Sequence, residues 1–259
     1  MDLNLAGRRA LITGASKGIG AATARVLAEE GCALHLAARG AEALDELAGK
    51  LRADCGTEVR THPVDLREPA AVARLAQDAG DVDILINNAG DLPGGPLHAL
   101  DDQAWRHGFD LKVFGYISLT RQIYAGMKQH GGGVIVNNIG ASGERFDADY
   151  IAGCTGNAAL IAFTRTLGGV SLKDNIRVVG VSPGPVDTER IVSLMKSVAA
   201  ARLGDAGRYR ELAADFPLGR SATTREIADT ITFLASGRSS YTSGVVLTVD
   251  GGMTAATSL

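Results

Sequence analysis

The stretch TGASKGIG at residues 13–20 decides how this chain folds. It is preceded by RRALIT at 8–13, a short apolar run typical of a strand, and it leads into IGAATARVLAEEG at 19–31. Apolar residues recur in the second segment at helical spacing, and the pattern stops at a glycine. The glycines of the quoted stretch therefore lie at a turn from a strand into a helix.

Each glycine of this turn meets a different steric need. Gly14 permits the turn, Gly18 lets the backbone approach a bound phosphate, and Gly20 allows the helix to pack close to the sheet. A helix N-terminus also offers free N–H groups and the positive end of its dipole to an anion. The spacing is GxxxGxG and not the commoner GxGxxG, and many such turns need glycine for the turn alone. The loop predicts a dinucleotide site only together with the rest of the chain.

Strand-like and helix-like segments alternate from one end of the chain to the other. This alternation predicts right-handed βαβ units and a parallel sheet covered on both faces. We therefore expect an α/β fold, a Rossmann-type doubly wound parallel sheet in three α/β/α layers, with all 259 residues in a single domain. Beyond the first pair, the expected strands are 33–39, 58–66, 82–88, 132–138, 175–184 and 244–252, and the expected helices are 41–54, 69–80, 100–129, 154–171 and 225–236.

Composition and charge argue against several classes of function. The net charge of −3 and the pI near 6.0 give no electrostatic footprint for nucleic acid or an anionic membrane. Cys32, Cys55 and Cys154 are lone thiols without a CxxC pair, which indicates a reducing compartment. The histidines show no metal-ligand spacing, so we expect no metal. Because the sequence shows no signal-peptide stretch or run of transmembrane length, we expect a cytoplasmic protein.

Five short motifs follow one another along the chain. They are Thr13-Gly14-x-x-x-Gly18-Ile19-Gly20, Asp65-Leu66, Asn87-Asn88-Ala89-Gly90, Pro183-Gly184 with Thr188, and Asp250-Gly251-Gly252. On these motifs the chain resembles the short-chain dehydrogenase/reductase family over nearly its full length. The resemblance implies a single NAD(P)-binding Rossmann domain over residues 1–259.

The resemblance also implies where a nicotinamide cofactor binds. In this family the Asp-Leu pair lies against the adenine, and the Asn-Asn-Ala-Gly stretch supports the sheet beside the cofactor. The Pro-Gly segment with its threonine holds the nicotinamide carboxamide. The expected cofactor-binding residues are Gly14, Ser16, Lys17, Gly18, Ile19, Gly20, Arg39, Asp65, Leu66, Asn88, Ala89, Gly90, Pro183, Gly184, Val186 and Thr188.

The end of the second strand favours NADP(H) over NAD(H). A carboxylate there would accept hydrogen bonds from a ribose 2′-OH and repel a 2′-phosphate. The chain instead reads Ala37-Ala38-Arg39, and Lys17 in the glycine loop adds a second cation. Arginine binds phosphate bidentately, and lysine binds it as a point charge. The alternative is that both cations are solvated surface groups.

The family's catalytic residues are absent from their expected positions. Aligning VIVNNIG with the strand that precedes the family's serine places Gly140 at the serine position. The tyrosine then falls at Gly153 and the lysine at Asn157, because NAAL matches the family's KAAL without a gap. The family's active-site asparagine falls at Lys112. The chain therefore lacks the usual proton donor, the cation that supports it and the hydroxyl that holds the substrate oxygen.

Three nearby residues are candidates to replace the missing groups. A register shifted by three would make Tyr150 the family's tyrosine, but Cys154 would then replace the lysine, so we prefer the ungapped register. We expect Tyr150 to be the proton donor, one helical turn before its aligned position, with Lys112 as the supporting cation. Ser142 is the candidate ligand of the substrate oxygen. The alternatives are a packed aromatic ring, a solvated lysine and a loop hydroxyl.

Three functions are compatible with these residues. The first is an NADP(H)-dependent oxidoreductase that transfers hydride between the cofactor and a small carbonyl or alcohol substrate, with an atypical proton-transfer site. The second is an NADP(H)-binding regulator or partner subunit without turnover, and the third is a lyase or isomerase. Fold alone does not separate them. The intact nicotinamide-side residues favour the oxidoreductase.

Two further expectations concern the surface. The segment GERFDAD at 143–149 places Glu144, Arg145, Asp147 and Asp149 at the rim of the expected cleft, either as a solvated network or as a selector of polar substrates. The resemblance also implies a homotetramer, or at least a homodimer. In it the helices at 100–129 and 154–171 pair with their copies, and the C-terminal strand region forms a second contact.

Overall fold

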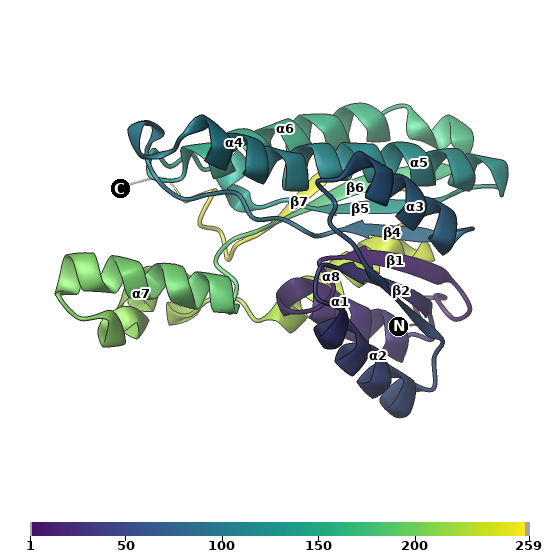
Figure 1. Cartoon of the computed structure of the whole chain (residues 1–259), viewed down its shortest axis with the longest axis horizontal. Coiled ribbons are helices and arrows are strands. Elements are labelled where there is room, and N and C mark those ends of the chain that lie inside the picture. Colours follow the sequence, from purple (N-terminus) through teal and green to yellow (C-terminus); the bar gives the residue numbers. More distant parts are fainter. Residues whose placement is uncertain (1, 257–259) are drawn as a thin grey trace.

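A seven-stranded parallel sheet forms the centre of the molecule (Figure 1). The computed structural model describes residues 2–256, apart from the side chains of residues 197, 198, 201 and 202. The strand order is β3-β2-β1-β4-β5-β6-β7. The strands are β1 Arg9–Thr13, β2 Ala33–Ala38, β3 Val59–Pro63, β4 Ile84–Asn87, β5 Gly133–Asn138, β6 Ile176–Pro183 and β7 Val246–Val249.

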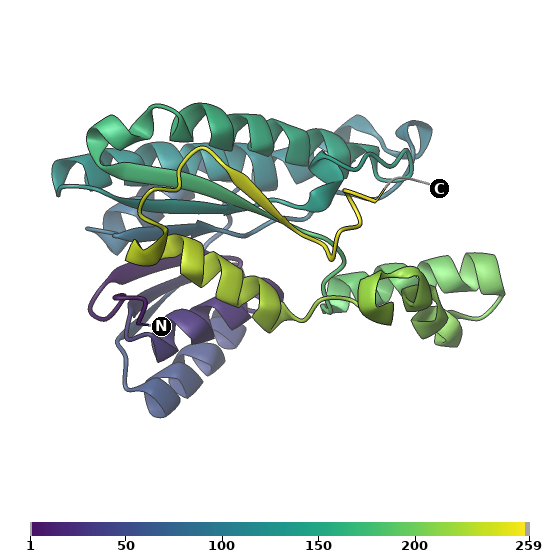
Figure 2. The ribbon, with the colours of Figure 1, turned by 180° about the vertical axis from the view of Figure 1, so that it is seen from behind.

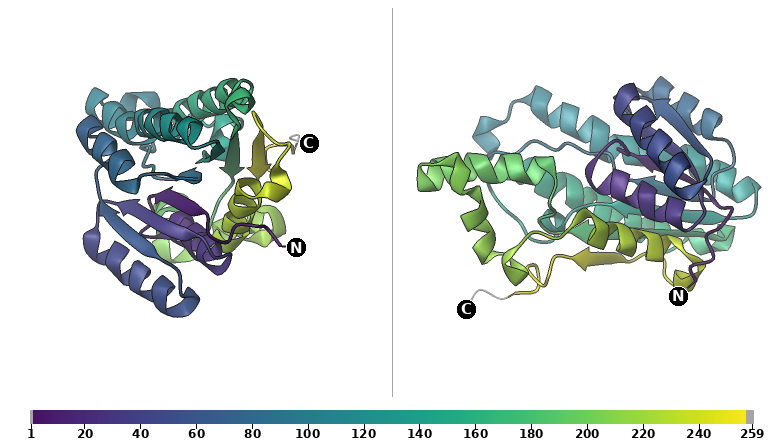
Figure 3. Two further views of the ribbon diagram at one scale, coloured as in Figure 1. Left: turned by 90° about the vertical axis from the view of Figure 1, so that its right-hand side faces the viewer. Right: turned by 90° about the horizontal axis from the view of Figure 1, so that it is seen from below.

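Helices cover both faces of this sheet, as the end-on view in Figure 3 shows. One face carries α3, α4, α5 and α6, and the other carries α1, α2 and α8. The expected doubly wound, three-layer α/β fold is confirmed. The helices are α1 Gly18–Glu29, α2 Ala41–Cys55, α3 Pro69–Ala79, α4 Asp102–Phe109, α5 Gly115–Gln129, α6 Ile151–Gly168, α7 Glu189–Leu203 and α8 Thr224–Ala235, with the π-helical turn η2 Asp110–Phe114 and the 3-10 turns η1 Leu97–Ala99, η3 Ala141–Gly143, η4 Ser171–Asp174, η5 Ala206–Asp215, η6 Pro217–Gly219 and η7 Gly237–Ser239.

The two faces of the sheet have separate cores because side chains alternate along each strand. On β1, Ala10 and Ile12 pack with α1, α2 and α8, whereas Leu11 packs with α3 and α5. All three side chains are fully buried. Burial on both faces accounts for strands that read as unbroken apolar runs.

Two helix boundaries differ from the sequence expectation. The segment 100–129 is not one regular helix, because the π-helical turn η2 separates α4 from α5. Helix α6 begins at Ile151, three residues before the expected start at 154, with Tyr150 as its N-cap residue. Both differences lie beside the expected active site, and π-helical turns are frequent at functional sites.

Helix α7 and the following 3-10 turn η5 project from the sheet as a separate arm (Figures 1 and 2). We refer to residues 189–215 as the arm. Its first helical turn lies close to the carboxyl ends of the strands, where β6 leads into it. None of the helices described over residues 2–256 is long and apolar enough to cross a membrane.

Candidate active site

A long cleft runs along the carboxyl ends of the central strands. Strands β1 and β4 are neighbours there, and the chain leaves them toward opposite edges of the sheet, which is where open α/β sheets bind ligands. Fourteen of the sixteen expected cofactor residues line it: Gly14, Ser16, Lys17, Gly18, Ile19, Arg39, Leu66, Asn88, Ala89, Gly90, Pro183, Gly184, Val186 and Thr188.

The glycine loop has the geometry that a diphosphate needs. Gly14 and Gly18 have φ of +63° and +59°, a region that side-chain-bearing residues rarely adopt. A Cβ added at Gly20 would lie 2.2 Å from the carbonyl oxygen of Gly14, so only glycine permits this close packing. Lys17, the N-cap residue of α1, makes no side-chain cap, so the first N–H groups of the helix are available to an anion.

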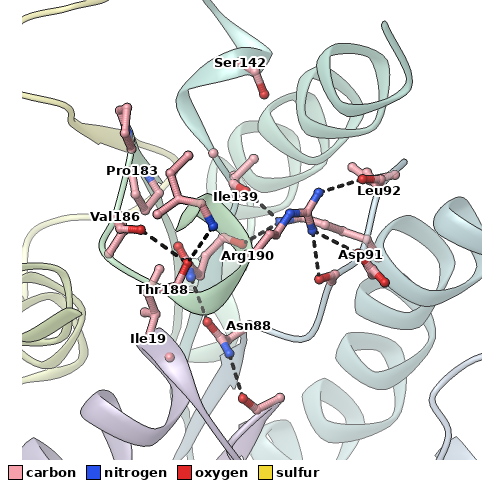
Figure 4. A pocket seen from close by; sticks show the side chains of 18 of the residues that line it. Ile19, Asn88, Asp91, Leu92, Ile139, Ser142, Pro183, Val186, Thr188 and Arg190 are labelled. Atoms are coloured by element: carbon pink, nitrogen blue, oxygen red, sulfur yellow. Dashed lines mark hydrogen bonds and ion pairs between the residues drawn. The ribbon is translucent and has the colours of Figure 1, made fainter. Parts of the chain in front are cut away.

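The Asn-Asn-Ala-Gly motif ties the ends of three strands together beside this loop. The Asn88 side-chain amide donates to the carbonyl oxygens of Thr13 at 2.9 Å and Gly14 at 3.2 Å. Its oxygen accepts a hydrogen bond from Asn138 at 2.8 Å (Figure 4). The Thr13 hydroxyl accepts from the backbone N–H groups of Asn88 and Ala89. The motif therefore supports the sheet, as the resemblance implies.

Asp65, which is expected to lie against the adenine, is paired with a neighbouring residue of the chain. Its carboxylate accepts a hydrogen bond from Arg67 Nε at 2.9 Å, and this interaction lowers its pKa. Leu66 and Val64 line the cleft, whereas the side chain of Asp65 is held away by Arg67. The carboxylate of Asp65 is therefore paired within the chain, and its place against the adenine stays a prediction.

The two cations expected at a 2′-phosphate both lie in the cleft wall, but only one of them is in an ion pair with a described residue. Arg39 lines the wall at the end of β2, and among the described residues no hydrogen bond or ion pair to it is seen. Lys17 pairs with Glu189 of the arm at 2.7 Å, and both side chains are exposed. Sequence reasoning missed Arg25, which lines the same wall two turns into α1 and pairs with Asp54 at 3.0 Å. Helical spacing from the glycine loop would have found it.

The segment after β6 closes the other end of the expected cofactor site. A Cβ added at Gly184 would lie 2.8 Å from Cβ of Asp250, so the C-terminal Asp-Gly-Gly motif fixes the position of this segment. Thr188 is the N-cap residue of α7 and accepts a hydrogen bond from the backbone N–H of Ile191. Its hydroxyl also donates to the carbonyl oxygen of Val186 at 3.2 Å.

The ring of Tyr150 occupies the space that a side chain at position 153 would fill. A Cβ added at Gly153 would lie 2.0 Å from Cε1 and 2.1 Å from Cζ of Tyr150. The early start of α6 places Tyr150 at the helix N-terminus, and its side chain folds back over Gly153. The Tyr150 ring can therefore take this position only because residue 153 has no side chain.

Arg190, which sequence reasoning missed, is the hydrogen-bonding partner of this phenol. Its Nη2 donates to the Tyr150 hydroxyl oxygen at 3.0 Å and to the carbonyl oxygen of Leu92 at 2.6 Å. Its Nη1 pairs with the carboxylate of Asp91 at 3.2 Å (Figure 4). The sequence held one signal for Arg190 as a site residue. Arg190 lies two residues after Thr188, in the segment expected to cover the nicotinamide.

Lys112 reaches the end of β5 and not the phenol. Its Nζ donates to the carbonyl oxygens of Ile139 at 2.7 Å and Asn138 at 3.3 Å. Its stem crosses Gly90, where an added Cβ would lie 2.5 Å from Cδ. Burial, and then the charge of Arg190, lower the pKa of Lys112 to about 7. The expected contact between Lys112 and Tyr150 is not formed in the described part of the chain.

Ser142 lies at the cleft and is hydrogen-bonded to the residue at the position where the family's lysine is expected. Asn157 Nδ2 donates to Ser142 Oγ at 2.7 Å, and a Cβ added at Gly140 would lie 2.9 Å from the same nitrogen. The Asn157 side chain therefore fills the space beside Gly140. Its Oδ1 is buried and has no hydrogen-bond partner among the described residues. The same is true of Oδ1 of Asn138. Two buried acceptors in the cleft wall fit the hydroxyl donors of a ribose or a substrate.

One residue of the GERFDAD loop ties the loop to neighbouring elements, and the following residues line the cleft. Glu144 pairs with Arg165 at 3.1 Å and accepts a hydrogen bond from Thr248, so it ties the loop to α6 and β7. Residues 145–149 line the outer part of the cleft. Among them Phe146 is 75% exposed, which leaves its ring available to a bound molecule.

Comparison with known proteins places this geometry in a family. The matching family model is described as enoyl-(acyl carrier protein) reductase and covers residues 14–254. The cis-4-hydroxycyclohexanecarboxylate dehydrogenase of Sinomonas cyclohexanicum is 39% identical over 256 residues, which cover 96% of this chain and 97% of that protein.

Two solved structures share the fold over almost the whole chain. The L-sorbose reductase of Gluconobacter frateurii, solved with NADPH and L-sorbose, has a TM-score of 0.92 at 32% identity and covers 99% of this chain and 100% of its own. A 7α-hydroxysteroid dehydrogenase, solved with NADH and 7-oxo glycochenodeoxycholic acid, has a TM-score of 0.86 at 27% identity and covers 97% and 96%. The chain therefore belongs to the short-chain dehydrogenase/reductase family of NAD(P)-dependent oxidoreductases.

Proposed function

We propose that the protein is an NADP(H)-dependent oxidoreductase that interconverts a carbonyl and an alcohol group with Tyr150 as its proton donor. One observation carries this proposal: the ring of Tyr150 fills the space beside Gly153 that the family's tyrosine side chain would take. The intact segment from Pro183 to Thr188 supports it, since a scaffold without redox chemistry has no need to position a nicotinamide ring.

The chain's own residues provide what the reaction requires apart from hydride. When bound, the reduced nicotinamide supplies hydride to the carbonyl carbon. The carbonyl oxygen must then gain a proton, which Tyr150 gives from its hydroxyl group. The Ser142 hydroxyl holds the substrate oxygen. Lys112 uses two N–H groups on backbone carbonyls and keeps a third for a hydroxyl of the cofactor or substrate.

NADP(H) is the proposed cofactor because the cleft wall at the end of β2 carries positively charged side chains. The two solved relatives hold different cofactors, NADPH and NADH, so the choice rests on this chain's residues. Arg39 stands where a carboxylate would select a 2′-hydroxyl, and Arg25 lies in the same wall. Lys17 is already paired, but an exposed ion pair is weak and a phosphate can compete for the lysine.

The substrate is proposed to be a small organic molecule with a ring or chain carbonyl. The relatives are named for a hydroxylated ring carboxylate, a ketose and an oxo-steroid conjugate. In this chain Phe146, Leu194, Phe216 and Met253 give the outer cleft an apolar lining. We place the reaction in the cytoplasm, in keeping with the lone thiols.

The experiment that tests this function follows NADPH oxidation against a panel of ketones, aldehydes and quinones, and NADP⁺ reduction against the corresponding alcohols. The expected result is turnover of at least one pair in both directions. Tight NADPH binding without turnover of any compound in the panel would contradict it and would favour a regulator that binds cofactor without catalysis.

A further inference from the structure

In this chain the position of the family's lysine holds a neutral residue, so it cannot provide a positive charge. The family's lysine follows its tyrosine by four residues on one helix, and Asn157 stands there. Its side chain is neutral and is turned to Ser142. Lys112, the other cation of the inner cleft, is bonded to the end of β5. A phenol that loses its proton in this site therefore needs its positive charge from another element.

Arg190 brings a positive charge to the phenol from the arm. Its guanidinium contacts the Tyr150 oxygen at 3.0 Å and is anchored at the same time to the loop after β4. That anchor consists of the carbonyl oxygens of Leu92 at 2.6 Å and Gly90 at 3.5 Å and the carboxylate of Asp91 at 3.2 Å. A planar group with five N–H donors can hold all of these partners together.

We propose that Arg190 is the positioning residue that orients the Tyr150 phenol and stabilises its phenolate, the electrostatic role that the family gives to lysine. The inference rests on the proposed function of Tyr150. In the reducing direction the Tyr150 O–H bond breaks, its proton forms the new O–H bond of the alcohol, and its electron pair remains on the phenolate oxygen. The oxidant and reductant are the substrate and the nicotinamide, and solvent returns the proton to the phenolate.

The charges around the phenol oppose one another. Burial raises the pKa of Tyr150 and the Arg190 charge lowers it, while Cys154 and the carboxylate of Asp91 raise it. Arg190 is the favourable charge in this set, and a cation within about 4–6 Å of an acid lowers its pKa by about 1–3. Removing Arg190 should therefore raise the pKa of the phenol, and removing the Asp91 charge should lower it.

The origin of Arg190 on α7 links proton transfer to the position of the arm. The guanidinium reaches the phenol only when the first turn of α7 lies against the loop after β4, because the same guanidinium makes both contacts. In the family arrangement the cation and the phenol share one helix and need no such closure. In this chain the supporting charge is complete only with the arm in place.

The test measures ionisation of the phenol without any turnover. Ultraviolet absorbance of tyrosinate is followed against pH in the full-length protein, and the Tyr150 signal is isolated by subtracting the Tyr150→Phe titration. Arg190→Gln keeps hydrogen-bond donors and removes the charge, and Arg190→Lys restores it. We expect the phenol pKa to rise by about 1–3 in Arg190→Gln, to return toward wild type in Arg190→Lys and to fall in Asp91→Asn.

Kinetics of the same variants complete the test. Arg190→Gln should lower kcat by about tenfold to a hundredfold, and added guanidinium ions should restore part of it. The control is Arg208→Met, which removes an arm arginine bound to Glu211 outside the cleft and should leave kcat unchanged. An unchanged phenol titration in Arg190→Gln would overturn this inference while leaving Tyr150 as donor. Full turnover by Tyr150→Phe would instead overturn the proposed function.

Discussion

Single residues carry the proposed cofactor choice at one end of the cleft and the proposed proton transfer at the other. At the cofactor end, Arg39 replaces a carboxylate and lies in the wall without an ion-pair partner among residues 2–256. At the reaction end, we propose that residues from other elements take the roles of the usual tetrad. Tyr150 comes from the start of α6 and Arg190 from α7. In this proposal, the space and the charge that these two side chains provide maintain the proton transfer.

Arg39→Ala should weaken NADPH binding by about tenfold to a hundredfold and leave NADH binding nearly unchanged, because a charge-assisted bond to the 2′-phosphate is lost. Lys17→Ala should have a smaller effect, since Lys17 already pairs with Glu189. Dissociation constants for both nucleotides from calorimetry check this. Equal affinities in the wild-type protein, or a parallel loss for NADH, would show that Arg39 does not read the phosphate.

At the scale of elements, the early start of α6 and the glycine at position 153 depend on each other. Helix α6 gains one turn, which carries Tyr150 to the cleft, and the missing side chain at Gly153 makes room for the ring. A helical glycine whose Cβ position faces open space only weakens its helix. Gly126 in α5 is such a position, with no atom within 4 Å of an added Cβ.

Gly153→Ala and Gly126→Ala form a matched pair that separates these two effects. Gly126→Ala should stabilise the protein by about 0.5–1 kcal/mol and leave kcat unchanged. Gly153→Ala should displace the Tyr150 ring and lower kcat by about tenfold or more, because the donor leaves its position. Thermal unfolding and steady-state kinetics measure both. Normal turnover in Gly153→Ala would show that the position of the ring is not critical.

Strands β2 and β3 carry a pair of histidines, one buried and one partly buried, that makes stability depend on pH. His35 Nδ1 and His62 Nε2 lie 2.9 Å apart, and burial, followed by His62, lowers the pKa of His35 from 6.5 to about 4. The unfolded chain binds a proton below pH 6.5 that the folded chain binds only near pH 4, so stability is lost as the pH falls through this range. Between pH 6.5 and about 4, the melting temperature of the wild type should fall by a few degrees more than that of His35→Gln.

At the scale of the whole molecule, large apolar side chains are exposed on more than one face. Phe233 on α8 and Leu247 on β7 are 41% and 45% exposed, and β7 is an edge strand of the sheet. Phe114, before α5, is 55% exposed on another face. Apolar side chains gathered on an open edge are covered in most soluble proteins.

We therefore predict a homotetramer, or at least a homodimer, at micromolar concentration. Leu247→Lys should shift the mass measured by light scattering toward a smaller species, because the charge would be buried in the contact. Circular dichroism serves as the control that the monomer fold is retained. A wild-type monomer at that concentration would contradict the prediction.

Local patterns were sufficient to predict the fold and to find most of the residues that line the cleft. The glycine loop, the apolar strands and the order of the motifs each depend on neighbours in sequence, and Gly14, Gly18 and Asn88 lie where they were expected. The contacts of Arg190 with Leu92 and Tyr150 were not predictable, because they join segments far apart in the chain. A local pair with Arg67 holds the carboxylate of Asp65, and the sequence analysis did not predict this pair.

The most direct test of the central claim is the kcat of Tyr150→Phe at saturating NADPH on a substrate that the wild type accepts. The phenylalanine ring keeps the packing over Gly153 and removes only the hydroxyl. Tyr241→Phe, at a fully exposed tyrosine, is the control. The account predicts a loss in kcat of about a hundredfold to ten-thousandfold with the NADPH dissociation constant unchanged. Turnover close to that of the wild type would contradict it and would move the proton donor to another group of the cleft.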